Sequence, residues 1–232
     1  MRAEGSGDVH MRMALEFAKT GMARFISHLD LQRAFSRAIR RSGLSVKLSE
    51  GFNPHYIVSF ASALSLGMES ECECVEMAMA EDIDADAFLL ALARALPPGL
   101  VAKRAVRLRE GAPKLMAALS EADYEMPIDM ARADDFRRAT DDLLKRDVIE
   151  AVKVSDGKEK TIDIRPLIKD IAVQDGKLVM RLSAAQTGAL KPELLLNELE
   201  KQTGAFARDV KRTALYTMQN GTATTLLDAF KQ

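Results

Sequence analysis

The sequence predicts an α+β protein built from two tandem ferredoxin-like halves, each with an antiparallel sheet and two helices on one face. Two observations lead to this prediction. Segments in which apolar residues alternate, the period of a half-buried strand, occur between segments with the 3.6-residue period of an amphipathic helix. The resulting order of elements is βαββαβ in the first half and the same order with one added strand in the second. Proteins with this fold have many unrelated functions, so the fold alone predicts none.

The first half begins with a strand in which apolar residues fill every second position from Met11 to Phe17. Ser27, with Asp30 three residues later, is a variant of the capping box and predicts the start of a helix. Gly43 suits the position just after the end of that helix, and a Pro-Pro-Gly run closes a second helix. We therefore expect strands at 11–18, 45–48, 55–61, 71–80 and 101–109, and helices at 27–42 and 84–96.

The second half follows a Gly-Ala-Pro break at 111–113 and a short Leu-, Met- and Ala-rich turn or helix at 114–119. Asp175-Gly176 is a signal for a two-residue hairpin. Pro192 suits the first turn of a helix, and Gly204 suits the position after its end. We expect strands at 124–130, 148–154, 161–164, 168–173, 177–183 and 209–218, and helices at 134–146 and 192–202.

These signals divide the chain into five parts. They are a disordered tail at 1–10, a first ferredoxin-like domain at 11–110, a linker at 111–121, a second ferredoxin-like domain at 122–218 and a C-terminal tail at 219–232. The first ten residues lack the apolar stretch of a secretory signal, and no later run is long and apolar enough to span a bilayer. We therefore expect a cytoplasmic protein with no membrane partner.

The overall charge and the cysteine content exclude several classes of site. The 33 Lys and Arg residues nearly balance the 34 Asp and Glu residues, so attraction to an anion must come from local clustering. The only cysteines are Cys72 and Cys74, whose spacing places both on one face of a strand. Two thiolates do not complete a four-ligand zinc or iron–sulfur site, and no companion ligands lie nearby. We expect free thiols, no bound metal and no cofactor.

The helix that begins at Ser27 has the strongest chemical pattern in the chain. Its apolar residues at i, i+4, i+7 and i+8 from Leu31 form one stripe, and four arginines repeat the same offsets two positions later. These arginines, which we call the arginine face, are Arg33, Arg37, Arg40 and Arg41. Arg24, just upstream, and Lys47, just downstream, could join this cluster and attract an anionic ligand. The alternative is a solvated helix face whose arginines pair with nearby acids.

Two histidines flank this helix in the sequence. His28 lies at its N-terminal end, where a neutral imidazole can act as a general base or bind a phosphate; the alternative is a structural histidine bonded to backbone. The turn at 51–55 presents Phe52, Asn53 and His55 together, which suits stacking on a base or reading its edge. The alternative is a plain tight turn with Phe52 in the core. We expect His28, Asn53 and His55 to converge on one pocket beside the arginine face.

Several of these motifs together resemble the radical SAM-linked protein family, a bacterial domain of unknown function. The motifs are Phe-Ile-Ser-His-Leu-Asp30, Arg37-x-x-Arg40-Arg41-Ser-Gly43, Glu50-Gly-Phe-Asn-Pro-His55, Ser59-Phe60-Ala61, Leu66-Gly67-x-x-Ser70, Ile162-Asp-Ile-Arg-Pro166 and Lys211-Arg-Thr213. The resemblance extends from about Met11 to Thr217. It implies a domain found beside, or fused behind, a radical SAM enzyme. This chain has no Cys-x-x-x-Cys-x-x-Cys motif, so the resemblance implies service to a separate enzyme.

Three hypotheses about function follow. The first is an accessory module, not an enzyme on its own, that binds an anionic substrate, RNA, for a separate radical SAM enzyme. The second is a metal-independent ribonuclease with His28 as the catalytic residue, similar to the CRISPR repeat-processing endoribonucleases. Those enzymes use a glycine-rich loop near the C-terminus, of which Asn220-Gly221 is the only trace here. The third is a protein–protein adaptor whose arginines contact an acidic partner surface.

Overall fold

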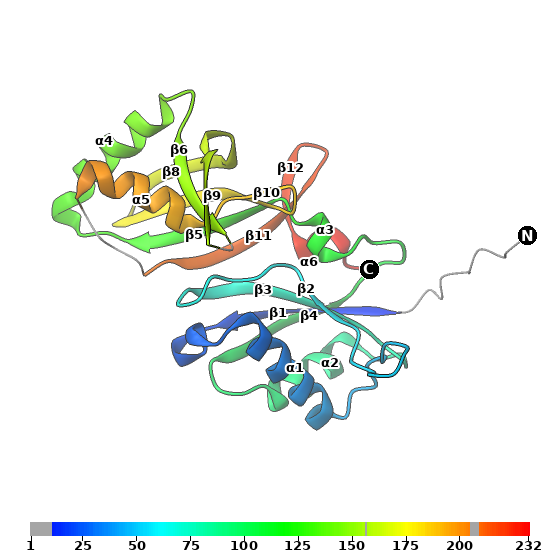
Figure 1. Ribbon diagram of the computed structural model, residues 1–232. Helices are drawn as coiled ribbons and strands as arrows, with labels where there is room; N and C mark the ends of the chain where they lie inside the picture. Colours follow the sequence, from blue (N-terminus) through cyan, green and yellow to red (C-terminus); the bar gives the residue numbers. More distant parts are fainter. Residues whose placement is uncertain (1–10, 156, 205–208) are drawn as a thin grey trace, which may run out of the picture.

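The computed structural model of the protein describes residues 11–155, 157–204 and 209–232. In these residues the chain has a mixed α+β fold with one large, mostly antiparallel sheet and six α-helices. Figure 1 shows the helices α1 and α2 at one end of the molecule and α4 and α5 at the opposite end, with the large sheet between them. The tail predicted at 1–10 lies outside the described residues. No described helix has the length and apolar character needed to cross a membrane.

The first half contains four strands in the order β4-β1-β3-β2, and every neighbouring pair is antiparallel. Its elements are β1 (Arg12–Lys19), η1 (Gly21–Phe25), α1 (His28–Ser42), β2 (Val58–Phe60), β3 (Glu69–Ala78), α2 (Ala85–Ala95) and β4 (Leu100–Arg107). The predicted capping of α1 is present, because the Ser27 hydroxyl accepts a hydrogen bond from the Asp30 amide and Gly43 ends the helix with a φ of 70°. The strand predicted at 45–48 is reduced to isolated bridges made by Val46 and Leu48.

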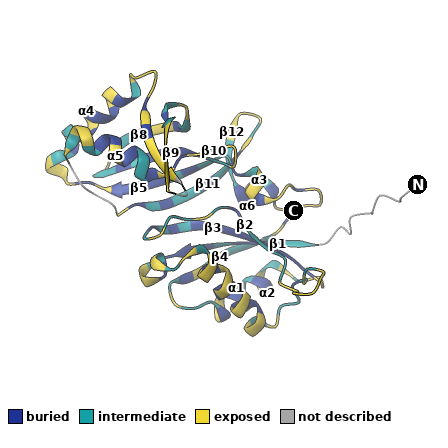
Figure 2. Cartoon of the chain, viewed as in Figure 1, coloured by how far each residue is buried: buried dark blue, intermediate teal, exposed yellow. Residues whose placement is uncertain are grey.

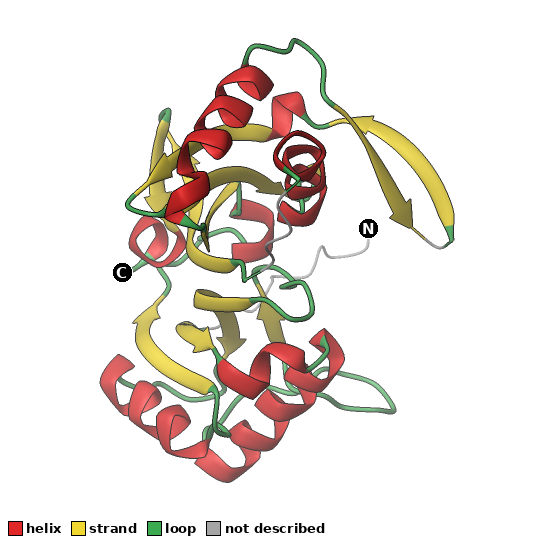
Figure 3. Ribbon diagram, turned by 90° about the vertical axis from the view of Figure 1, so that its left-hand side faces the viewer, coloured by secondary structure: helices red, strands yellow, loops and turns green. Residues whose placement is uncertain are grey.

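In the large sheet the second half has the strand order β8-β9-β5-β11, again antiparallel, with the short β10 also paired to β9. Its elements are β5 (Glu121–Pro127), η2 (Met130–Arg132), α4 (Ala133–Leu144), β6 (Glu150–Ser155), β7 (Lys158–Asp163), η3 (Arg165–Leu167), β8 (Ile168–Gln174), β9 (Lys177–Ala185), β10 (Gly188–Ala189), α5 (Pro192–Thr203) and β11 (Lys211–Gln219). The strands β6 and β7 form a separate two-stranded sheet. Figure 3 shows this hairpin projecting from the body of the molecule.

The two halves share one sheet, so the prediction of two independent sheets is not confirmed. The strand β11 pairs in parallel with β3, with Lys211 opposite Glu69 and Arg212 opposite Ser70. This pairing is available because β2 covers β3 only from Val75 to Met77 and leaves the start of β3 open on that edge. The result is a ten-stranded sheet that crosses the boundary between the halves.

Two segments outside the predicted domains contribute to the core. Residues 219–232, expected as a tail, include β12 (Thr222–Thr225), which pairs with β11, and α6 (Leu226–Phe230). Leu227 and Phe230 of α6 are buried. The expected linker at 111–121 contains α3 (Leu115–Ala118), and Leu115 is fully buried. These short segments pack because each presents apolar residues about one helical turn apart, which gives α3 and α6 one apolar side.

Both faces of the first-half sheet are covered. On one face Phe17 of β1 packs against Phe35 of α1 and Phe60 of β2, with ring centroids 4.9 Å and 6.2 Å away. On the other face Cys72 and Cys74 of β3 belong to the core of the second half. Alternation along β3 therefore places successive residues in two different cores.

A buried ion pair joins the two halves. The Arg212 guanidinium of β11 lies 2.9 Å from a carboxylate oxygen of Glu73 in β3, and these side chains are only 7% and 3% exposed. The same guanidinium donates hydrogen bonds to Ser62 Oγ, to the Ala63 carbonyl and to the Tyr124 hydroxyl. Glu73, Ser62 and Ala63 belong to the first half, and Tyr124 belongs to β5 of the second. The charge of Arg212 is therefore satisfied only while the halves are joined.

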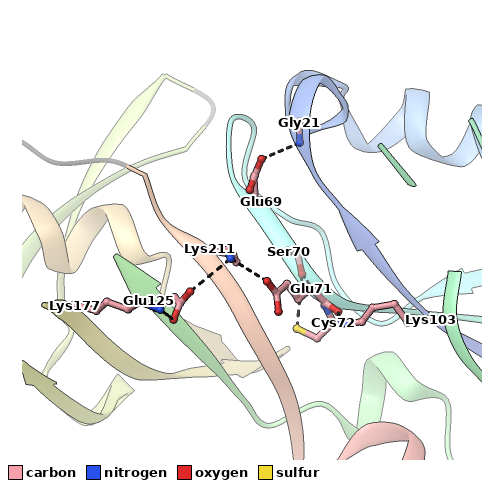
Figure 4. Close-up of polar contacts among 9 residues, drawn as sticks. All are labelled: Gly21, Glu69, Ser70, Glu71, Cys72, Lys103, Glu125, Lys177 and Lys211. Carbon is pink, nitrogen blue, oxygen red and sulfur yellow. Dashed lines mark hydrogen bonds and ion pairs between the residues drawn. The ribbon is translucent and has the colours of Figure 1, made fainter. Parts of the chain in front are cut away.

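A second, more exposed network of charges follows the same boundary (Figure 4). Lys211 lies 2.9 Å from Glu71 of β3 and 3.6 Å from Glu125 of β5, so one ammonium group bridges the halves. Lys177 of β9 pairs with the same Glu125 at 2.8 Å. The Lys211 side chain is 33% exposed, so solvent screens these contacts more than it screens the Arg212 pair.

We predict that Arg212→Met lowers the free energy of unfolding by about 3–5 kcal/mol, because it leaves the Glu73 carboxylate buried without its charged partner. The neighbouring substitution Lys211→Met, which removes a partly exposed cation, costs less than about 1 kcal/mol. Chemical denaturation followed by circular dichroism measures both values.

The double variant Glu73→Met/Arg212→Met distinguishes two causes of the destabilisation: a buried Glu73 carboxylate without its charged partner, or the loss of packing by the Arg212 side chain. It should be more stable than Arg212→Met alone, because no charge remains buried without a partner. Equal destabilisation by Arg212→Met and Lys211→Met contradicts the account of this junction.

Candidate functional site

The arginine face lies on the outside of α1. The helix buries Leu31, Phe35 and Ile39 against the sheet, and its opposite side is coloured as exposed in Figure 2. All four arginines of the face are exposed, as their spacing predicts. Arg40 and Arg41 lie in the last turn, where the negative end of the helix dipole favours cations.

The charge of this face is only partly neutralised within the chain. Arg33 pairs with Asp30 at 3.0 Å, and Arg41 donates a hydrogen bond of 2.6 Å to the Ala95 carbonyl at the end of α2. Arg37 and Arg40 make no hydrogen bond or ion pair with any residue that the structure describes. Four arginines against one aspartate leave α1 with a net charge of +3 when His28 is counted as neutral.

The helix α4 shows the contrasting arrangement. Its two arginines each pair with an aspartate three residues earlier: Arg137 with Asp134 and Arg138 with Asp135, both at 2.6 Å. Two arginines against four aspartates give α4 a net charge of −2. Local pairing therefore involves both arginines of α4, whereas on α1 it involves Arg33 alone among the four arginines of the face.

A groove runs beside the arginine face. One wall is a single side of α1 formed by Leu29, Gln32, Arg33 and Ser36, and the other is formed by His55, Tyr56, Val58 and Phe60. Its volume is about 450 Å³. Arg33 lines the groove, and Arg37 and Arg40 follow it along the helix at i+4 and i+7. The groove therefore has a cationic rim and an interior with aromatic and imidazole groups.

The two histidines approach this groove in different ways. His55 lines it directly and places Nδ1 2.8 Å from Ser49 Oγ. The His28 ring packs edge-on against Phe60 with centroids 5.4 Å apart, and its Nε2 lies 3.2 Å from the Gln32 amide nitrogen. Because an amide nitrogen can only donate, His28 Nε2 accepts this bond and its lone pair is occupied. His28 thus contacts two residues of the groove lining.

The loop between α1 and β2 places its aromatic residue in solvent. Phe52 is 106% exposed, so the alternative in which its ring enters the core is wrong. Gly51 has a φ of 112°, a backbone conformation that favours glycine, and this turn carries Phe52 outward. Phe52 and Asn53 are not among the described residues that line the groove. Of the three residues expected to converge, His55 lines the groove, His28 contacts two of its lining residues, and Asn53 is not part of the described lining.

Arg24 does not join the arginine face. Its guanidinium lies 3.3 Å from Asp209 of the second half and 5.0 Å from the centre of the Phe25 ring. It also lines a cavity at the boundary between the halves. Its closeness to α1 in the sequence suggested a shared site, but η1 directs Arg24 toward the second half.

The cysteines are buried and carry no sign of a metal site. Burial is the main reason that the pKa of Cys72 rises to about 12 and that the pKa of Cys74 rises well above its usual value. In the part of the chain that the structure describes, no three His, Cys, Asp or Glu side chains are grouped as metal ligands.

We predict that both thiols resist alkylation in the folded protein at pH 8. The reactive species is the thiolate, and at a pKa of about 12 only about one Cys72 thiol in 10⁴ is ionised at that pH. Iodoacetamide treatment followed by intact-mass measurement should show two added groups in denaturant and none without it. Rapid modification of the native protein contradicts this burial.

Comparisons with known proteins identify a family but no activity. A family model described as "Uncharacterized protein conserved in bacteria (DUF2344)" matches residues 12–192, and that description names no substrate, cofactor or partner. No curated protein matches the chain. Among solved structures, "Crystal Structure of an Unknown Protein from Galdieria sulphuraria" covers 90% of this chain and 99% of its own at 13% identity, with a TM-score of 0.27. A score this low supports no argument about fold or function.

Proposed function

The chain belongs to the DUF2344 family of uncharacterized proteins conserved in bacteria. We propose that it is an accessory module that binds RNA through α1 for a separate radical SAM enzyme. The observation that carries the proposal is the incompletely neutralised charge of the arginine face beside the groove. A net charge of +3 on one helix, in a protein whose overall charge is −1, favours an anionic ligand at this place.

The extent of the face favours a polyanion over a single small anion. Arg33 and Arg41 are eight residues apart, which corresponds to about 12 Å along the helix axis. A row of charges of this length suits successive phosphates of one strand. The groove adds surfaces for unpaired bases, because His55, Tyr56 and the exposed Phe52 offer rings for stacking. Single-stranded RNA combines both features.

The strand orders help to explain why the helix, not the sheet, is the proposed RNA surface. We infer that each half is a ferredoxin-like unit, because β4-β1-β3-β2 and β8-β9-β5-β11 share one antiparallel arrangement. RNA-binding domains of the RRM type stack bases on the open face of their four-stranded sheet. In the first half α1 and α2 cover one face and the core of the second half covers the other. The outer side of α1 remains accessible.

The role as accessory to a radical SAM enzyme rests on the sequence resemblance. Two of the resembling motifs, at 25–30 and 50–55, contribute His28 and His55 to the groove region, and a third contains Arg37 and Arg40. Features that identify the resemblance thus gather around the proposed RNA site. The alternative role for His28 as a general base is less favoured, because its Nε2 lone pair already accepts from Gln32.

We predict that Arg37→Ala/Arg40→Ala weakens binding of a fluorescent single-stranded RNA about tenfold or more. The slope of log affinity against log salt should become shallower by about 1.4, or about 0.7 for each lost phosphate contact. Fluorescence anisotropy at several salt concentrations measures both changes. The matched control is Arg137→Ala/Arg138→Ala on α4, whose arginines are already paired and whose loss should leave RNA binding unchanged.

Equal RNA binding by the two double variants places the site elsewhere and removes the proposal's main support. If the α1 variant binds RNA normally but no longer binds a purified radical SAM enzyme, the arginines contact an acidic protein surface and the adaptor hypothesis replaces this one. If the parent protein cleaves RNA unaided and His28→Ala abolishes the cleavage, the protein is a ribonuclease.

A further inference from the structure

A second cavity lies at the boundary between the two halves, apart from the groove of α1. Its volume is about 310 Å³, at the lower end of the range for small-molecule sites. The first half contributes Arg24 and the segment 66–68, and the second half contributes residues of β5, α4 and α5 and Val210, which precedes β11. Its described lining combines an apolar surface with one cation and two carboxylates.

The wall formed by α5 presents three polar side chains, one of which has a buried atom without a partner in the described ranges. Glu193, Asn197 and Glu200 are spaced at i, i+4 and i+7, which places all three on one side of the helix. The Glu193 oxygen Oε2 is buried and has no hydrogen-bond partner among the residues that the structure describes. Neither carboxylate forms an ion pair with a described residue. Buried polar atoms are normally satisfied, so this oxygen needs a donor that the described part of the chain does not supply.

Arg24, which the first half contributes to the lining, presents the complementary requirement. Its Nε group is buried and has no hydrogen-bond partner in the part of the chain that the structure describes, and the contact of Arg24 with Asp209 uses a different nitrogen at 3.3 Å. The apolar part of the lining includes Met68, Met126 and Phe136. The cavity therefore holds one donor without an acceptor and one acceptor without a donor, on walls from different halves.

We propose that this cavity binds a small zwitterion with an apolar body, of the chemical class of apolar amino acids and short apolar peptides. Its ammonium group would bind Glu193 and Glu200, its carboxylate would bind Arg24, and its apolar side chains would contact Met126 and Phe136. A purely cationic ligand leaves Arg24 Nε unsatisfied, and a purely anionic ligand leaves Glu193 unsatisfied. A ligand with both charges satisfies both atoms and also matches the charges of Glu193 and Arg24. This proposal is independent of RNA binding by α1.

Isothermal titration of the full chain with L-phenylalanine and with L-leucyl-L-leucine tests the proposal. These probes place the two charges at different separations. At least one should bind at a single site, and its N-acetyl and C-terminal amide derivatives, each lacking one charge, should bind about tenfold more weakly or worse.

Variants locate the site. Glu193→Gln and Arg24→Gln should each weaken binding about tenfold, whereas Glu159→Gln on the exposed strand β7 should have no effect. Asn197→Trp provides a second route, because this exposed position can accept a bulky ring that fills the cavity without disturbing the core. Thermal melting of each variant confirms that it is folded.

Three results overturn the proposal. They are absence of binding by both probes up to about 10 mM, equal binding by the singly charged derivatives, and unchanged binding by folded Glu193→Gln and Asn197→Trp proteins.

Discussion

The arrangement of the molecule depends on the buried contact between Arg212 and Glu73, whose positions in the chain are 139 residues apart. A guanidinium that is 7% exposed needs its carboxylate, and Glu73 equally needs Arg212, because an unpaired buried charge is strongly unfavourable. Separating the halves would leave both charged groups without their partner and would also break the hydrogen bond from Arg212 to the Tyr124 hydroxyl. The halves are thereby held in one arrangement, and the cavity between Arg24 and α5 depends on that arrangement.

Local signals predicted the helices well, and long-range pairing accounts for what they missed. Ser27 and Gly43 mark the ends of α1, and Pro192 and Gly204 mark those of α5, because caps and turns act through neighbouring atoms. The parallel pairing of β11 with β3 involves only two residue pairs between segments far apart in the sequence. The alternation of residues within a strand does not reveal which other strand it pairs with. The helix α6 was missed because a five-residue segment is too short to show a clear helical period.

The sequence predicted which face of the helix the arginines of the candidate site occupy, but it did not predict which residues of other elements the arginines contact. Helical periodicity placed the arginine face on the outside of α1, and the pairing of Arg33 with Asp30 follows from the same geometry. The contacts of Arg24 with Asp209 and of Arg41 with the Ala95 carbonyl depend on packing between elements, so no local pattern showed them. The carboxylates of α5 had a visible i, i+7 spacing, but the chemistry of the cavity required Arg24 from the first half, which only the fold supplies.

The proposed RNA site lies on the surface of α1 and of the loop between α1 and β2. Both lie away from the contact between Arg212 and Glu73 that joins the halves. Photo-crosslinking tests this placement most directly. A single-stranded RNA that contains 4-thiouridine is irradiated with the protein, and the attached residues are identified by mass spectrometry. The account predicts adducts on Phe52, His55 or Tyr56, which lie in or beside the groove of α1. Adducts confined to the second half, or none on residues 28–60 although RNA is bound, contradict it.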